Sequence, residues 1–78
     1  MSQHNVTIYS TPTCSYCIMS KNLFDKMGVQ YKDVDVSKDH AAAMEMVRKS
    51  GQTGVPVIDI DGNILVGYQP AAFDQLLK

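Results

Sequence analysis

Apolar runs typical of strands alternate along this chain with stretches whose apolar residues recur at helical spacing. The run Val6–Ser10 is β-branched and aromatic and ends at Thr11-Pro12-Thr13, which predicts a strand followed by a turn. From Ser15 to Met27 the apolar residues recur at helical spacing, and Gly28 follows them as a left-handed cap. We therefore expect a strand, a turn and a helix up to Gly28, and a second strand over residues 30–36.

A second helix is predicted over residues 38–49. Ser37 is the expected N-cap residue, and Gly51 is the expected stop. Methionines at helical spacing fill irregular gaps in a core more often than they bind metal. On this ground we expect three side chains to pack in the core: Met19, Met44 and Met46.

The last third of the chain predicts a hairpin and a closing helix. Asp61-Gly62 lies between the apolar runs Val57–Ile60 and 64–66, and a type I′ turn needs residues that accept positive φ at both central positions. Pro70 suits the first position of a helix over residues 70–77. The predicted order is β-α-β-α-β-β-α. A right-handed βαβ unit whose sheet is extended by a hairpin indicates one α/β domain over residues 1–78, with helices on the sheet faces.

Composition and charge narrow the class of partner. The 78 residues are 45% hydrophobic and 19% charged, and the formal net charge is −1. The basic residues are scattered, so we expect no nucleic-acid partner. No stretch reaches membrane-spanning length, and residues 1–15 carry neither a basic flank nor an apolar run typical of a secretory leader. We expect a cytoplasmic monomer with protein or small-thiol partners and no membrane partner.

The chemistry of the chain centres on Cys14-Ser15-Tyr16-Cys17, where the first strand passes into the first helix. Backbone N–H groups and the positive end of the helix dipole would lie beside the sulfur of Cys14 and stabilise its thiolate, the form that attacks disulfides. Cys17, one turn further along, would then attack the mixed disulfide on Cys14 and release the reduced product. The pair therefore predicts thiol–disulfide exchange, with Cys14 as nucleophile and Cys17 as resolving thiol.

Other uses of a Cys-x-x-Cys pair fit less well. A structural disulfide would close too short a loop to stabilise the fold much. A zinc site needs four ligands, and the two histidines, His4 and His40, lie in the amino-terminal segment and at the start of the second helix. We expect no metal site. An iron–sulfur cluster shared by two chains stays open as an alternative, because two copies would supply four thiolates. A redox-sensing domain without turnover also stays open.

Two further features are candidates for substrate binding. If the Val55-Pro56 bond is cis, the backbone N–H and C=O of Val55 are free to pair with an extended partner beside Cys14. The alternative is an ordinary trans proline that opens a strand. Tyr16, between the two cysteines at a helix start, is expected to be exposed and able to touch a partner.

With these residues in place, the chain resembles the glutaredoxin family along nearly its whole length. The resemblance rests on the strand Val6–Ser10, the run from Thr13 to Cys17, the segment Gly54-Val55-Pro56 and the Asp61-Gly62 hairpin, in family order. It implies a thioredoxin-like fold with a four-stranded mixed sheet and a cis Val55-Pro56 bond. It also implies dithiol exchange at Cys14 on disulfide-containing proteins, with no resident cofactor and with glutathione as a possible co-substrate.

The chain departs from the family pattern where glutathione carboxylates would bind. Thr11 stands where typical glutaredoxins have a basic residue, and Gly67-Tyr68-Gln69-Pro70 stands where they have two glycines and an acid. Ser15 replaces the usual proline between the cysteines. The segment around Gly67-Tyr68-Gln69-Pro70 is similar to that of the glutaredoxin-like hydrogen donors of ribonucleotide reductase. We therefore expect a thioredoxin-reductase-type flavoenzyme as reductant, with glutathione as the alternative.

Overall fold

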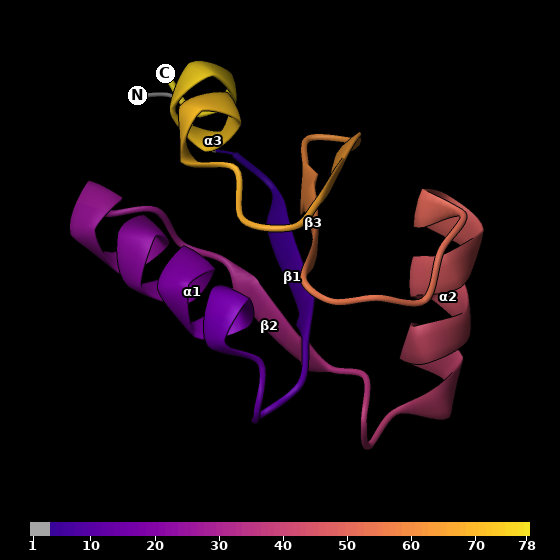
Figure 1. Cartoon of the computed structure of the whole chain (residues 1–78). Helices are drawn as coiled ribbons and strands as arrows, with labels where there is room; N and C mark the ends of the chain where they lie inside the picture. The colour runs from indigo at the N-terminus through magenta and orange to yellow at the C-terminus, as the bar shows by residue number, and fades with distance from the viewer. Residues whose placement is uncertain (1–3) are drawn as a thin grey trace.

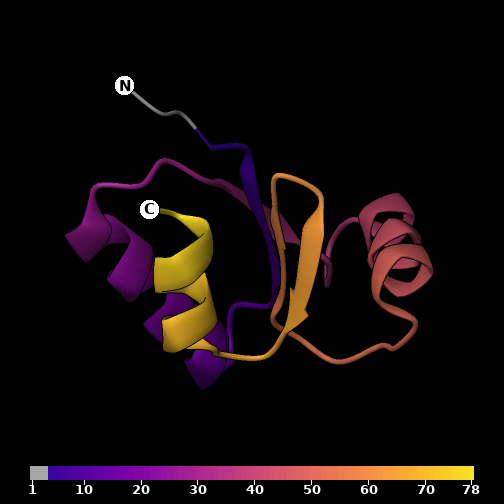
Figure 2. The ribbon, with the colours of Figure 1, turned by 90° about the horizontal axis from the view of Figure 1, so that it is seen from above.

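A four-stranded sheet with strand order β2-β1-β3-β4 separates two layers of helices in the computed structural model, which describes residues 4–78. Helices α1 and α3 cover one face of the sheet, and α2 covers the other (Figures 1 and 2). The elements follow the predicted order: β1 Val6–Ser10, α1 Ser15–Met27, β2 Lys32–Asp35, α2 His40–Ser50, β3 Val57–Ile60, β4 Asn63–Val66 and α3 Pro70–Leu76. Within this described part of the chain, no helix is long and apolar enough to span a membrane.

The sheet is mixed, as the resemblance implied. Strand β1 runs parallel to β2 and antiparallel to β3, so β1 joins the βαβ unit to the β3–β4 hairpin. Asp61 and Gly62 join β3 to β4 with φ values of 53° and 91°. Positive φ at both central positions is what a type I′ turn requires, so the predicted hairpin is confirmed.

Each face of the sheet has its own buried cluster. On the side of α1 and α3, the rings of Phe24 and Phe73 lie 5.0 Å apart and pack with the isoleucines of β1 and β3. On the α2 side, Tyr9, Met46 and Val57 are buried together. The expected burial of methionines is right for Met46 alone: the exposed fractions of Met19 and Met44 are 43% and 61%. Both side chains lie on the solvent-exposed faces of their helices, Met19 on α1 and Met44 on α2.

Two predicted boundaries are wrong by a few residues. The second strand is confined to Lys32–Asp35, because only these residues pair with β1. The second helix begins at His40, and Asp39 caps it by accepting a hydrogen bond from the Ala42 N–H at 3.0 Å. Ser37, the predicted cap, instead donates its N–H to the Asp35 carboxylate at 2.9 Å. Asp35 thus forms a turn that delays the helix start.

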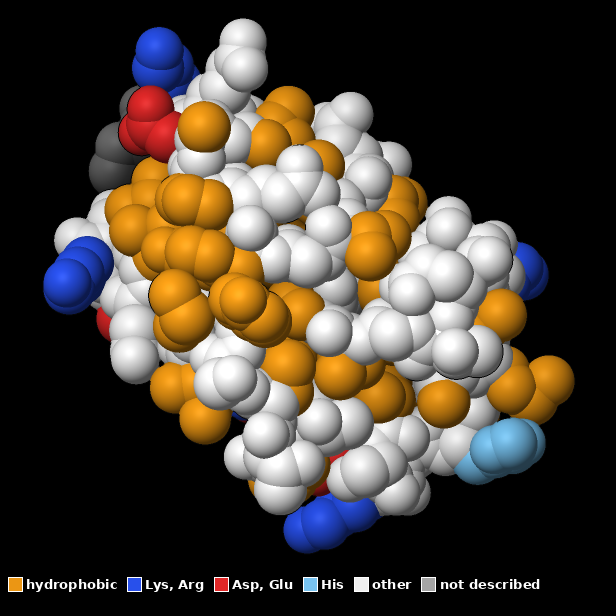
Figure 3. Space-filling view, in the orientation of Figure 1, with side chains coloured by type: hydrophobic (Ala, Val, Ile, Leu, Met, Phe, Trp, Pro, Cys, Tyr) orange, Lys and Arg blue, Asp and Glu red, His pale blue; other side chains and the backbone are white. Residues whose placement is uncertain are grey.

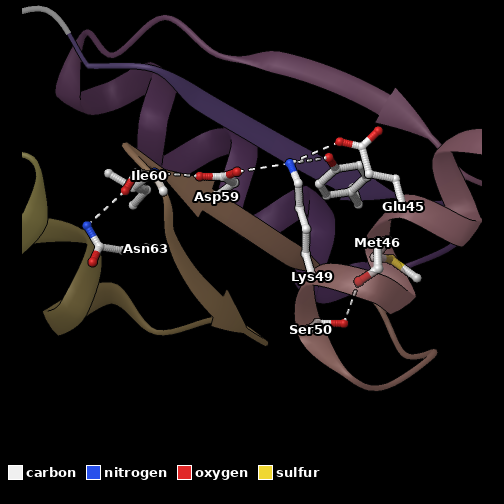
Figure 4. Close-up of polar contacts among 9 residues, drawn as sticks. Glu45, Met46, Lys49, Ser50, Asp59, Ile60 and Asn63 are labelled. Atoms are coloured by element: carbon white, nitrogen blue, oxygen red, sulfur yellow. Dashed lines mark hydrogen bonds and ion pairs between the residues drawn. The ribbon is translucent and has the colours of Figure 1, made fainter.

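Lys49 ties α2 to the sheet (Figure 4). Its Nζ donates to the Tyr9 hydroxyl at 3.0 Å and to the Asp59 carboxylate at 3.1 Å, and it lies 3.2 Å from the Glu45 carboxylate one turn back. The hydrogen bonds to Tyr9 and Asp59 raise the pKa of Lys49 above its ordinary value. One ammonium group thereby connects α2, β1 and β3.

We expect Lys49→Met to lower the free energy of unfolding by about 1 kcal/mol at neutral pH, since water screens these contacts. Because folding raises the pKa of Lys49, its contribution is present at neutral pH and is lost as the pH rises above the ordinary lysine range. Urea unfolding at neutral and alkaline pH measures both effects. Arg48→Met, which changes an exposed neighbour, is the control and should leave stability within about 0.5 kcal/mol. Equal losses for both variants would contradict the role of Lys49.

Candidate active site

Cys14 is the residue that caps α1. Its backbone is extended, with φ −87° and ψ 111°, and its Sγ accepts a hydrogen bond from the Cys17 N–H at 3.2 Å. The sulfur therefore takes the place that a Ser, Thr or Asp oxygen usually fills at a helix N-terminus. The sulfur of Cys14 therefore lies at the positive end of the dipole of α1, next to the Cys17 N–H. The sequence placed Cys14 at the helix start but did not indicate that its sulfur is the cap.

Cys17 lies one turn inward and is fully buried, whereas Cys14 is partly exposed. Both thiols are free in this structure. Burial, followed by the hydrogen bond with Cys14, raises the pKa of Cys17 to about 12. Cys17 is thus protonated near neutral pH. Cys14 is therefore the accessible sulfur of the pair, and Cys17 is the recessed one.

The Val55-Pro56 bond is cis, as the resemblance implied. Tyr9 of β1 pairs with Val57 of β3, so this antiparallel register places Val55-Pro56 at the end of β1 from which the cysteine loop leaves. The Pro56 carbonyl accepts a hydrogen bond from the Gly67 N–H at 2.9 Å. That contact brings the segment before α3 to the same end of the sheet.

Tyr16 is exposed, with 59% of its surface accessible, as the sequence predicted. Its ring stacks on Tyr68 with centroids 6.5 Å apart and an interplanar angle of 21°, and Tyr68 in turn meets Phe73 edge-on at 6.1 Å. The stack joins the start of α1 to the segment before α3. Sequence reasoning missed this pair, because no local pattern relates residues so far apart in the chain.

Among the described residues, no group of three or more His, Cys, Asp and Glu side chains could hold a metal ion. The Nδ1 of His4 lies 2.6 Å from the Asp61 carboxylate at the hairpin turn. His40 is the first residue of α2, on the opposite face of the sheet from α1. Neither histidine joins the cysteine pair, so the chemistry available at this site is that of the two thiols.

Comparison with known proteins decides the family. The glutaredoxin family model matches residues 6–65. The chain therefore belongs to the glutaredoxin family. It is 44% identical, over 94% of its length and 97% of the relative's, to an uncharacterized glutaredoxin-like 8.6 kDa protein in the rubredoxin operon of Clostridium pasteurianum. It is 38% identical to glutaredoxin 3 of Escherichia coli K12, over 81% of this chain and 76% of that one.

A solved structure supports the fold of this glutaredoxin. A mutant of the thioredoxin-like protein BC3987 superposes with a TM-score of 0.88 at 30% identity and covers 94% of both chains. The predicted thioredoxin-like fold is thus confirmed. Membership of the family indicates thiol–disulfide oxidoreductase activity, which needs no prosthetic group.

Three segments next to the cysteines in this glutaredoxin contain no charged side chains. Three segments meet at this end of the sheet through the contacts of Tyr16, Tyr68, Gly67 and Pro56, and none of them contains Lys, Arg, Asp or Glu: residues 11–20, 50–58 and 62–73. Figure 3 shows hydrophobic side chains gathered over α1 and beside α3, with the charged side chains at the margins of this face. The site therefore offers a partner apolar contact and backbone hydrogen bonds rather than ion pairs.

Proposed function

We propose that this glutaredoxin reduces disulfide bonds in proteins through Cys14 and Cys17. The Cys14 thiolate attacks one sulfur of the partner disulfide, which forms a mixed disulfide and releases the first partner thiol. Cys17 then attacks the sulfur of Cys14, which forms the Cys14–Cys17 disulfide and releases the second partner thiol. Two electrons and two protons pass from the dithiol to the partner. The observation that supports these roles most directly is the Cys17 N–H donating to Cys14 Sγ while Cys17 itself is buried.

The neighbouring groups would hold the partner in an extended form. The Val55 backbone, which is half-buried and precedes the cis proline, would pair with a strand of the partner. Tyr16 presents an exposed ring supported by Tyr68, which reduces the side-chain entropy lost on contact. Pro56 is buried and would fix the position of Val55.

Counting thiols before and after the reaction tests the function. The reduced protein, mixed with a protein disulfide such as insulin, should lose two thiols for every two that the substrate gains.

The absence of charge in the three segments around the cysteines bears on the reductant. Glutathione carries two carboxylates, and charge-assisted hydrogen bonds to such groups are about twice as strong as neutral ones. No Lys or Arg lies in residues 11–20, 50–58 or 62–73 to supply them. A flavoenzyme of the thioredoxin reductase type can dock by apolar contact. We propose such an enzyme as the reductant, with glutathione as the slower one.

The oxidised protein, offered each reductant separately, should be reduced faster by a thioredoxin reductase with its nicotinamide cofactor than by glutathione at millimolar concentration. Cofactor absorbance and thiol titration measure the two rates. Thr11→Lys, which adds a cation before the cysteines, should raise the glutathione rate several-fold, roughly the value of one charge-assisted contact. Asn22→Lys, the control, adds the same charge further along α1 and should leave the glutathione rate unchanged. A faster rate with glutathione for the unmodified protein would contradict the proposed reductant.

A further inference from the structure

Lys21 follows Cys17 by one helical turn on α1, so the two side chains lie on the same helix face. The ammonium group of Lys21 is held rather than free: its Nζ lies 2.7 Å from one carboxylate oxygen of Asp33 on β2. The other oxygen of Asp33 accepts a hydrogen bond from the Ser10 hydroxyl at 2.7 Å. The network thus fixes a cation beside the helix turn that carries Cys17.

This network is anchored close to the cysteine loop. Ser10 is buried and is the last residue of β1, so Thr11 and the loop that leads to Cys14 follow it directly. Burial tends to lower the pKa of Lys21, but the hydrogen bond and the charge of Asp33 outweigh it and hold that pKa above its ordinary value. Lys21 therefore stays charged at every pH at which the thiols react.

Two charged or ionisable groups act on the buried thiol of Cys17, and they oppose each other. Besides burial, Cys14 raises the pKa of Cys17 by its hydrogen bond and its charge, whereas the Thr11 backbone and the Lys21 cation lower it. When Cys14 enters a mixed disulfide, it carries neither a thiol proton nor a negative charge. The influence of Cys14 then disappears, and the influence of Lys21 remains.

We propose that Lys21, held by Asp33, is a positioning residue for the resolving step, where its cation stabilises the anion that forms on Cys17 as this thiol attacks the mixed disulfide on Cys14. The inference rests on the proposed function and adds to it the order in which the two cysteines become nucleophiles. Cys17 stays a thiol while Cys14 is free, and it becomes the nucleophile once Cys14 is bonded to the partner. In the net step, the Cys17 proton passes through solvent to the departing partner thiolate, and the Cys14–Cys17 disulfide forms.

Reaction with excess 5,5′-dithiobis(2-nitrobenzoate) separates the two steps, since each releases one coloured thiolate. The first phase is the attack of Cys14 and depends on reagent concentration. The second phase is the attack of Cys17 on the mixed disulfide, and its rate does not depend on reagent concentration. Lys21→Gln should slow the second phase by about three- to tenfold near neutral pH and move its pH midpoint upward by about 0.5 to 1 unit, because the pair is partly exposed and screened. The first phase should be unchanged.

Lys21→Arg keeps the charge and should restore the midpoint of the unmodified protein, while Lys26→Gln, which removes an exposed cation from the last turn of the same helix, should change nothing. Asp33→Asn should leave the Lys21 cation present but less firmly positioned, so the pH midpoint of the second phase should rise by less than in Lys21→Gln. A second phase that slows equally at every pH, or that Lys21→Arg fails to restore, would indicate a merely structural role and overturn the proposal. So would identical rates for Lys21→Gln and Lys26→Gln.

A second measurement is independent of the exchange reaction. In a Cys14→Ser variant, the rate of Cys17 alkylation by iodoacetamide, followed by mass spectrometry, reports the thiolate fraction of Cys17 alone. Adding Lys21→Gln should move that pH profile upward, and adding Lys26→Gln should not. If the unmodified protein showed no first coloured phase, the proposed function would be contradicted. If Lys21→Gln left the pH profile of Cys17 alkylation unchanged, only the role of Lys21 would be contradicted.

Discussion

Cys14→Ser is expected to reduce disulfide reductase activity by about a hundredfold or more, because a serine hydroxyl at the helix start has no accessible anion that attacks sulfur. Cys17→Ser should leave the first attack intact, since the Cys17 backbone N–H that contacts Cys14 Sγ does not depend on the side chain at position 17. Its product should accumulate as a mixed disulfide on Cys14 that no second thiol resolves. Mass spectrometry of the protein after mixing with a disulfide substrate measures both outcomes.

Alkylation under reducing conditions gives a control that needs no substrate. Iodoacetamide near neutral pH should label Cys14 first, because Cys14 is partly exposed, whereas Cys17 is buried and its pKa is raised to about 12. The rate for Cys14 should be similar in the unmodified protein and in Cys17→Ser. Labelling of Cys17 before Cys14 would reverse the proposed roles of the two thiols.

Phe73→Ala is expected to lower the free energy of unfolding by about 3–5 kcal/mol, a large part of the roughly 5–15 kcal/mol that a domain has in total. Phe73 is the fully buried residue of α3, and its ring packs on that of Phe24, with 5.0 Å between ring centroids. A helix as short as Pro70–Leu76 does not persist without such packing. Urea unfolding, with the helical circular dichroism signal as probe, measures the loss.

The same substitution should also weaken substrate binding, because Phe73 supports Tyr68 and Tyr68 stacks on Tyr16. The control is Gln75→Ala, which changes an exposed residue of the same helix and should alter stability by no more than about 0.5 kcal/mol. If Phe73→Ala were as stable as this control, the contribution assigned to the α3 contact would be wrong.

The sequence by itself determined the order of the elements and the placement of the cysteines. These follow from local rules: alternation of apolar residues, glycine after a helix, Asp61-Gly62 at a tight turn, and Cys14 where a strand passes into a helix. Local rules were less exact at the start of α2. Ser37 and Asp39 are both good N-cap residues. Asp39 caps the helix because the backbone of Ser37 is already hydrogen-bonded to the Asp35 carboxylate.

Only the tertiary structure decided which distant groups act on the thiols. The stack of Tyr16 on Tyr68 and the chain from Lys21 through Asp33 to Ser10 join residues from separate elements. Such contacts depend on how α1 packs on the sheet and on the register of β1 with its neighbours, and no local pattern encodes either. The raised pKa of Cys17 has the same origin, because burial is a property of the packed layers. The sequence therefore determined the dithiol and its position, while packing decided which sulfur is accessible, which is buried and which cation lies beside it.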